Sequence, residues 1–325
     1  MEMLKLKPAC KDYLWGGHRL VEEYGIDYPG EVCAEAWTLS CHKDGESVVC
    51  SDESANDNFA GASKYDGMTL SEVIRECGKE ILGTNCKQFD DFPILIKLID
   101  AKRPLSIQVH PDDIYALKNE GQYGKTEMWY ILEAKEGAFL YEGFDHVISK
   151  GEFEERIKNN TLEEVLHKVY VKRGDVIFIS PGTLHAIGEG IVIAEIQQNS
   201  NVTYRIYDYG RLGADGKPRQ LHIKQSIDVT KLEPPAEYKA EGGQLASCPY
   251  FQVDAIEVKE GDSYELNVDS SSFVNLLAIE GSACVSASDN EQKMHLSKGE
   301  SLFIPAGVGN VKIEGESCVI LTRIP

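Results

Sequence analysis

Short apolar runs separated by turn residues dominate the chain from residue 93 onward. Each of the clearest runs has the length of a strand rather than of a long helix, and these runs cover residues 93–100, 127–132, 137–141, 173–182 and 191–198. Runs of this kind with Gly, Pro and Asp between them are typical of antiparallel sheets. The pattern therefore predicts a mainly β protein built as barrels or sandwiches.

Two stretches break this β pattern with helical signals. Ser or Thr is followed three residues later by Glu at Thr69, Ser149 and Thr161, which is the spacing of a capping box at a helix N-terminus. Apolar residues continue at helical spacing after Thr69. We predict a helical cap within about 52–92 and a helical insert at about 149–169.

The chain contains an internal repeat. Residues 298–307 match residues 173–182 at a constant offset of 298 − 173 = 125, and in this register His185 falls on Asn310. A repeat of this length indicates a duplicated structural unit. The second copy keeps the apolar and turn residues of the first copy. It lacks the polar residues with which the first copy could bind a ligand.

A segment rich in Pro and Gly separates the two copies and predicts a linker at 233–249. We therefore expect a metal-binding catalytic domain in 1–232 and a degenerate C-terminal domain in 250–325. A length of 325 residues is consistent with two domains. The nine cysteines form no C-x-x-C pair, so we expect reduced thiols and no sulfur-ligated metal.

Composition narrows the possible functions. With 33 basic and 53 acidic residues the formal net charge is −20, which argues against a nucleic-acid partner. No apolar run approaches the roughly 18–20 residues needed to cross a bilayer and no signal peptide is apparent, so we expect a cytoplasmic protein without a membrane partner. The negative field would repel an anionic substrate, which would therefore need basic groups gathered locally.

Four polar residues stand at positions that suit a metal ion. Gln108 and His110 are two residues apart in an extended run, so their side chains face the same way. Glu127 opens a later apolar run, and His185 follows another. Two imidazoles, a carboxylate and an amide oxygen predict a site for one zinc or similar divalent ion.

These residues also carry a family resemblance. The chain resembles the type I mannose-6-phosphate isomerases, in particular the short bacterial form with a C-terminal cupin. The resemblance covers nearly the whole chain and rests on these motifs: Trp15-Gly16-Gly17, Glu35-Ala36-Trp37, Ser106-x-Gln108-Val109-His110-Pro111, Gly124-Lys125-Thr126-Glu127-Met128-Trp129-Tyr130, Pro181-Gly182-Thr183-Leu184-His185-Ala186-Ile187-Gly188 and Tyr204-Arg205-x-Tyr207-Asp208-x-Gly210-Arg211.

The resemblance implies two cupin units, each a jelly-roll β-barrel, and a zinc-dependent interconversion of mannose 6-phosphate and fructose 6-phosphate. Gln108, His110, Glu127 and His185 would hold the zinc. Arg205 would be the active-site arginine, able to stabilise the enediolate through its permanent charge. Ser106 and Lys125 would contact the phosphate of the substrate.

Several points stay open at this level. The proton carrier could be a metal-bound water, Glu35 or Glu195. The basic residues Lys97 and Arg211 near the motifs could be functional or ordinary surface charge. Two alternatives to the isomerase are another metal-dependent cupin enzyme, such as an iron dioxygenase, and a non-catalytic cupin that binds sugar phosphates. The sequence does not fix the oligomeric state.

Overall fold

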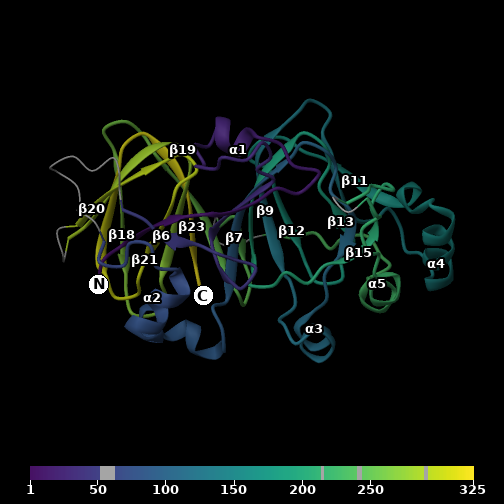
Figure 1. Ribbon diagram of the computed structural model, residues 1–325, viewed down its shortest axis with the longest axis horizontal. Helices are drawn as coiled ribbons and strands as arrows, with labels where there is room; N and C mark the ends of the chain where they lie inside the picture. The colour runs from purple at the N-terminus through teal and green to yellow at the C-terminus, as the bar shows by residue number, and fades with distance from the viewer. Residues whose placement is uncertain (52–62, 214–215, 240–243, 289–291) are drawn as a thin grey trace. The chain divides into compact units, whose positions relative to one another are not determined.

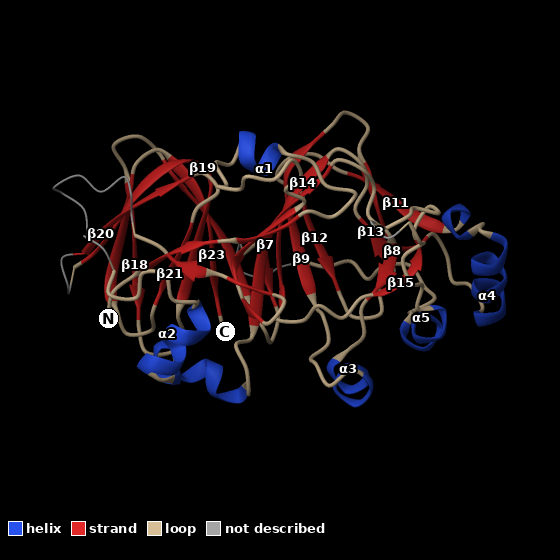
Figure 2. Cartoon of the chain, viewed as in Figure 1, coloured by secondary structure: helices blue, strands red, loops and turns tan. Residues whose placement is uncertain are grey.

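The computed structural model describes residues 1–51, 63–213, 216–239, 244–288 and 292–325. Strands make up most of the regular structure, and the helices are short (Figure 2). The prediction of a mainly β protein is confirmed. Two compact units can be recognised, the first formed by Met1–Lys11, His18–Leu98 and Lys239–Pro325 and the second by Asp12–Gly17 and Ile99–Tyr238.

The second unit contains two groups of antiparallel strands. One group has the order β11-β10-β13-β8-β15, with bounds Leu166–Tyr170, Phe139–Phe144, His185–Ala186, Ile107–Val109 and Tyr204–Tyr207. The other places β9 between β12 and β14, with bounds Glu127–Ala134, Val176–Ile179 and Ile191–Gln198.

Apolar side chains fill the space behind the first of these groups. Ile107, Val109, Phe144, Leu184 and Tyr204 belong to one buried cluster, and they come from strands or strand ends that are far apart in sequence. Burial of side chains of this size stabilises the fold by roughly 1.5–3 kcal/mol each relative to exposure. The polar residues of the same strands are thereby held on a rigid frame.

Short helices lie outside the strands of the second unit, and Figure 1 labels α3, α4 and α5 at its periphery. Their bounds are Asp113–Asn119, Lys150–Asn159 and Ile223–Val229, with a 3₁₀ turn η3 at Leu162–Glu164. The helix α4 ends at Asn159, because Asn160 takes a left-handed conformation with φ 56°. The helical part of the predicted insert ends with η3 at Glu164. Residues 166–170 then form β11, not helix.

The first unit is built around a sheet with the order β16-β17-β23-β19-β21-β1-β6. These strands span Ala246–Ser247, Gln252–Val258, Ser317–Arg323, Val274–Ala287, Ser301–Ile304, Leu4–Lys7 and Val48–Val49. β18 (Ser263–Val268), β20 (Gln292–Ser297) and β22 (Gly309–Glu314) extend it through pairing of β22 with β18 and of β19 with both β20 and β22. The remaining strands are β2 (Ala9–Lys11), β3 (Glu35–Leu39), β4 (Cys41–His42), β5 (Gly45–Glu46) and β7 (Ile94–Ala101), which leads the chain into the second unit.

The repeat found in the sequence is present in the structure. β12 begins at Val176 and β21 at Ser301, again 125 residues apart. The glycines before these strands have nearly equal backbone angles, with φ 86° at Gly174 and φ 88° at Gly299. Only glycine adopts such angles without strain, so both copies use the same turn to enter the same strand.

The predicted helical cap is only partly helical among the described residues, and its residues 52–62 lie outside them. The helix α2 spans Leu70–Cys77 and begins with the full capping box between Thr69 and Glu72. It ends earlier than the apolar spacing suggests, because Gly78 has φ 91° and starts a new turn. The 3₁₀ turns η1 (Lys79–Leu82) and η2 (Thr84–Gln88) follow, and a short helix α1 occupies Arg19–Glu22.

The two compact units do not follow the predicted sequence boundaries 1–232 and 250–325, because segments from both ends of the chain belong to the first unit. The predicted linker 233–249 includes residues 240–243, which are not described, and ends in the strand β16. The functional division, with the metal-type residues before this segment, remains a prediction. Among the described residues no helix is both long enough and apolar enough to span a bilayer.

Candidate metal centre

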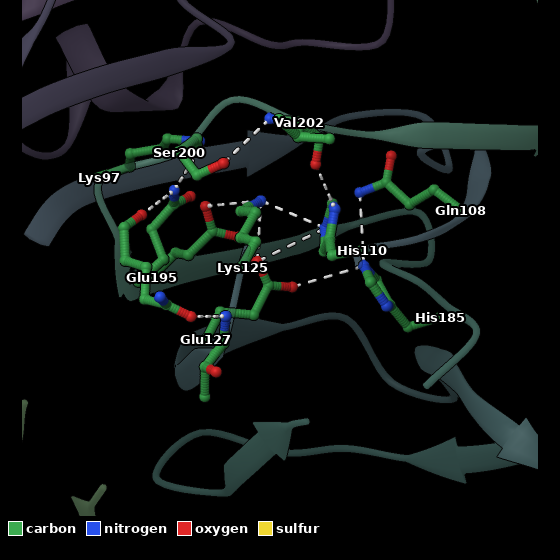
Figure 3. A network of polar contacts seen from close by, with 12 residues as sticks. Lys97, Gln108, His110, Lys125, Glu127, His185, Glu195, Ser200 and Val202 are labelled. Carbon is green, nitrogen blue, oxygen red and sulfur yellow. Dashed lines mark hydrogen bonds and ion pairs between the residues drawn. The ribbon is translucent and has the colours of Figure 1, made fainter. Parts of the chain in front are cut away.

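Three buried side chains of the second unit converge on one point. His110 follows β8, Glu127 opens β9 and His185 opens β13. Nε2 of His110 lies 3.7 Å from Oε2 of Glu127, and Nε2 of His185 lies 3.4 Å from Oε1 of the same carboxylate. All three ligand atoms are within 4.8 Å of one another, and Figure 3 shows the side chains pointing toward a common centre.

The far nitrogen of each imidazole is held by the backbone. Nδ1 of His110 lies 2.8 Å from the carbonyl oxygen of Val202, and Nδ1 of His185 lies 2.9 Å from that of Thr183. A carbonyl oxygen can only accept, so each Nδ1 carries the proton and donates it. The lone pair of each Nε2 therefore faces the centre, which is the usual arrangement of histidine ligands in metal sites.

Burial keeps His185 in the form that a metal requires. His185 has no exposed surface, and burial lowers the pKa of its imidazole to about 4, so the ring is neutral near pH 7. Glu127 is also fully buried. A buried carboxylate is costly unless a positive charge offsets it. Nζ of Lys125 lies 2.8 Å from Oε2 of Glu127 and 3.3 Å from Nε2 of His110.

Gln108 lies beside the three residues with its amide nitrogen toward the centre. Its Nε2 is 3.4 Å from Nε2 of His185, and its Oε1 accepts a hydrogen bond of 3.3 Å from Ser106. An amide coordinates a metal through oxygen, and the two orientations differ by a half-turn of the amide group. The position therefore fits a fourth ligand, whereas the orientation in this structure does not.

The donor set fits a divalent ion of the zinc type. Two neutral imidazoles and one carboxylate are the ligands of many catalytic metal sites, which keep further positions for water or substrate. The residues present can hold such an ion without sulfur ligands. Within the described part of the chain, this is the group of His, Cys, Asp and Glu side chains that could bind a metal.

The strand order places a row of polar side chains next to the centre. Across the sheet, Glu142 pairs with His185, His185 with Gln108, and Gln108 with Arg205. Directly paired residues share one face of a sheet. Nε of Arg205 donates to Oγ of Ser106 at 3.1 Å. Ser106 and Arg205, both predicted from the sequence, are thus brought together beside Gln108.

Lys125, the other predicted phosphate contact, lies at the metal-type residues Glu127 and His110. Its ammonium group contacts both of them, whereas Ser106 and Arg205 are hydrogen-bonded to each other. The contact of Lys125 with a substrate phosphate stays a prediction from the resemblance. The strand β15, which carries Arg205, ends at Tyr207, and Tyr209 beyond it has a left-handed backbone with φ 56°.

Sequence reasoning gave no role to three residues of this region. Glu142 is one of them, and burial raises the pKa of its carboxyl group to about 7. The other two are Asp208 and Arg219, which form hydrogen bonds of 2.7 and 2.5 Å with each other. Asp208 was visible in a motif, but the sequence carries no signal that pairs it with a residue eleven positions later.

The two carboxylates considered as proton carriers lie in different units. Glu195 on β14 accepts a hydrogen bond of 3.1 Å from Nε1 of Trp129, and its Oε1 is 3.9 Å from Nζ of Lys125. Glu35, in the first unit, accepts from Nε1 of Trp37 at 2.7 Å and lies 3.7 Å from Nζ of Lys97. Both are buried and hydrogen-bonded to an indole.

Comparison with known proteins agrees with this geometry. Residues 3–137 match the model of the phosphomannose isomerase type I catalytic domain, and residues 243–324 match that of the mannose-6-phosphate isomerase cupin domain. A mannose-6-phosphate isomerase of Streptococcus mutans is 36% identical over 99% of this chain and 98% of its own. One from Bacillus subtilis is 34% identical over 99% of both chains.

The chain belongs to the type I phosphomannose isomerase family. A crystal structure of the mannose 6-phosphate isomerase from Bacillus subtilis superimposes with a TM-score of 0.87, at 34% identity and with 99% of each chain covered. The predicted cupin fold is thereby confirmed. The first family match includes His110 and Glu127 but ends before His185.

Proposed function

We propose that this protein interconverts D-mannose 6-phosphate and D-fructose 6-phosphate and that its metal is zinc. The observation that carries the proposal is the convergence of His110, Glu127 and His185 in a chain whose relatives bear the name of this isomerase. The substrate is then a small sugar phosphate. The relatives reported above are all isomerases, so we do not retain the dioxygenase or the non-catalytic alternative. A cytoplasmic location and Gln108 as the fourth ligand are kept as part of the proposal.

The reaction moves a proton between carbons 1 and 2 of the sugar through an enediol. A bound divalent ion supplies Lewis-acid polarisation of the sugar oxygens. Arg205 stabilises the negative charge that develops on the substrate, because its guanidinium stays protonated at any physiological pH. Ser106, next to Arg205, can donate hydrogen bonds to the substrate or accept them from it. The row from His185 to Arg205 thus has metal ligands at one end and a cation at the other.

The proton carrier must be a group that touches the substrate and exchanges protons near neutral pH. Glu195 and Glu35 remain the two carboxylate candidates. Within the second unit Glu195 is fixed by Trp129, and its Oε1 lies 3.9 Å from the ammonium group of Lys125. Lys125 would link this carboxylate to Glu127, so a change of Lys125 would affect both.

The proposal predicts a metal-dependent activity. Protein stripped with a chelator should lose isomerisation of mannose 6-phosphate, and added Zn²⁺ should restore it, because the buried donors have the geometry of metal ligands. A coupled assay on metal-analysed protein measures this. Full activity in metal-free protein would contradict the metal assignment.

A matched pair of variants sharpens the test. Glu127→Gln removes the ligand charge with little change in volume, and we expect both metal content and activity to be lost. Glu133→Gln changes a carboxylate on the same strand, outside the cluster, and should leave both unchanged. If protein loaded with Zn²⁺ shows no turnover of mannose 6-phosphate, the isomerase proposal fails.

A further inference from the structure

Asp208 gathers two arginines around one buried carboxylate at the end of β15. Its Oδ2 accepts from Nε of Arg219 at 2.7 Å and its Oδ1 from Nη2 of the same residue at 2.5 Å. Oδ1 also accepts from Nε of Arg211 at 3.1 Å and from Nη2 of Arg211. Asp208 is 5% exposed. Although burial opposes it, the bonds from Arg219 and Arg211 lower the pKa of the carboxyl group.

A third guanidinium stands next to this pair. Arg205 donates from Nε to Oγ of Ser106 at 3.1 Å and from Nη1 to the carbonyl oxygen of Gln220 at 3.3 Å. Burial and the like charges of Arg219 and Arg211 lower the pKa of Arg205. The Oγ of Ser106 in turn donates to Gln108. The arginine group is therefore connected to the edge of the metal-type centre.

The charges of this group do not balance. Counting only residues that the structure describes, three guanidinium groups lie near one carboxylate, a surplus of two positive charges in a chain whose net charge is −20. A phosphate monoester carries about −1.5 to −2 near pH 7 and accepts strong hydrogen bonds from arginine. The local surplus therefore matches the charge of such a group, and it meets the need for focused basic residues in an acidic chain.

A purely structural role explains only part of the arrangement. Arg211 and Arg219 flank a small hairpin, in which Leu212 bridges to Pro218 and Gly213 donates to the carbonyl oxygen of Lys217. Asp208 closes the base of this hairpin. One ion pair would be enough to do so, and gathering three like charges costs repulsion. Arg205 has its own proposed role at the reacting part of the substrate, and the second ion pair of Asp208 is accounted for when an anion binds beside Arg211 and Arg219.

Arg219 has room to take part in anion binding. Its side chain is 25% exposed, and the bonds it makes with the described residues use Nε and Nη2. The bidentate contact with Asp208 fixes the plane of the guanidinium, so Nη1 projects from a rigid fork. A lysine at this position would keep the charge but could not be held in the same way.

We propose that Asp208 is a positioning residue that holds Arg211 and Arg219 beside Arg205, and that Arg219 is a further contact for the phosphate of the substrate. The inference rests on the proposed function for the identity of the sugar phosphate. The anion-binding part stands on the arginine geometry alone, so it can be tested without turnover.

The test is calorimetric titration of the metal-loaded full chain with inorganic phosphate. For Asp208→Asn and Arg219→Gln we expect binding to weaken about tenfold or more, as for loss of one charge-assisted hydrogen bond. The KM for mannose 6-phosphate should rise by a similar factor, with kcat within about twofold of wild type, because the phosphate lies away from the reacting carbons. Arg219→Lys should fall between wild type and Arg219→Gln.

Asp254→Asn is the matched control, since Asp254 pairs with Arg323 at 3.9 Å in strands of the first unit. It should bind phosphate like wild type. Should Asp208→Asn fail to fold, the two Arg219 variants carry the test. Unphosphorylated mannose is the neutral probe, because a general folding defect would weaken mannose and phosphate equally.

Unchanged phosphate affinity in Arg219→Gln would overturn the inference, and so would an equal loss of mannose and phosphate binding in both variants. The proposed function fails in a different way. If wild-type protein binds phosphate in an Arg219-dependent manner but does not isomerise mannose 6-phosphate, the anion site stands and the isomerase assignment does not.

Discussion

His185 shows how one residue links the fold to the chemistry. Its ring packs edge-on against Trp129 at 5.5 Å, its Nδ1 is fixed by Thr183, and its Nε2 faces Glu127. No part of it reaches solvent. The environment that makes it a good ligand also makes it a poor base, because a proton on Nε2 would be buried beside Lys125.

This burial predicts a pH dependence of stability in metal-free protein. Burial lowers the pKa of His185 to about 4 in the folded state, against about 6.5 in an unfolded chain. Between these values the unfolded chain binds a proton that the folded chain does not. The free energy of unfolding should therefore fall by about 3 kcal/mol through this residue as pH drops from about 6.5 to about 4.

Urea unfolding of metal-free wild type and His185→Gln at pH 7.5 and 4.5 measures the effect. The variant should lose less stability than wild type over this interval, since glutamine does not titrate. The exposed His146 provides the control, and His146→Gln should follow wild type. Equal losses in His185→Gln and wild type would rule out His185 as the source.

Sequence alone identified the centre because its chemistry is local. Gln108 and His110 share a strand face by simple alternation, Glu127 begins an apolar run, and His185 follows another. Asp208 and Arg219 could not be found in this way. Their contact depends on the closure of a hairpin and on side-chain directions, and neither leaves a regular spacing in the chain.

At the scale of elements, the same sequence pattern has two outcomes. Thr69 and Thr161 are each followed three residues later by Glu. Thr69 has an extended backbone with ψ 154°, and its side chain accepts from the backbone N–H of Glu72. Thr161 has φ −114° and ψ 16° and makes no cap bond. Because it directly follows the left-handed Asn160, its backbone is not in the extended region that a cap requires.

This difference gives a prediction for helix α2. Thr69→Ala should destabilise the protein by about 1 kcal/mol, because it leaves a helix N–H without its partner. Thr161→Ala should change stability by no more than about 0.5 kcal/mol, as at an ordinary surface position. Thermal unfolding of the two variants compares them directly. Equal destabilisation by both would show that the sequence pattern, not the backbone conformation, decides the cap.

At the scale of the molecule, the second copy of the repeat retains the barrel without the chemistry. Asn310, which corresponds to His185 in the repeat register, is exposed on β22, whereas His185 is buried. The core of this copy is apolar and includes Leu276, Leu296 and Ile313, all fully buried. The repeat was readable from sequence because turn glycines recur at a fixed offset. The grouping of both chain ends in one unit was not, since it depends on long-range pairing such as that of β1 with β21.

If the second copy is structural, damage to its core should lower stability without touching the active site. Leu276 lies on β19 with no exposed surface, and Leu276→Ala should cost about 2–5 kcal/mol by leaving a cavity. Metal content and kcat/KM should stay at wild-type values well below the unfolding temperature. Leu266→Ala, at a partly buried position against the same core, should cost less. A fall of metal content in folded Leu276→Ala protein would show that this barrel also supports the metal centre.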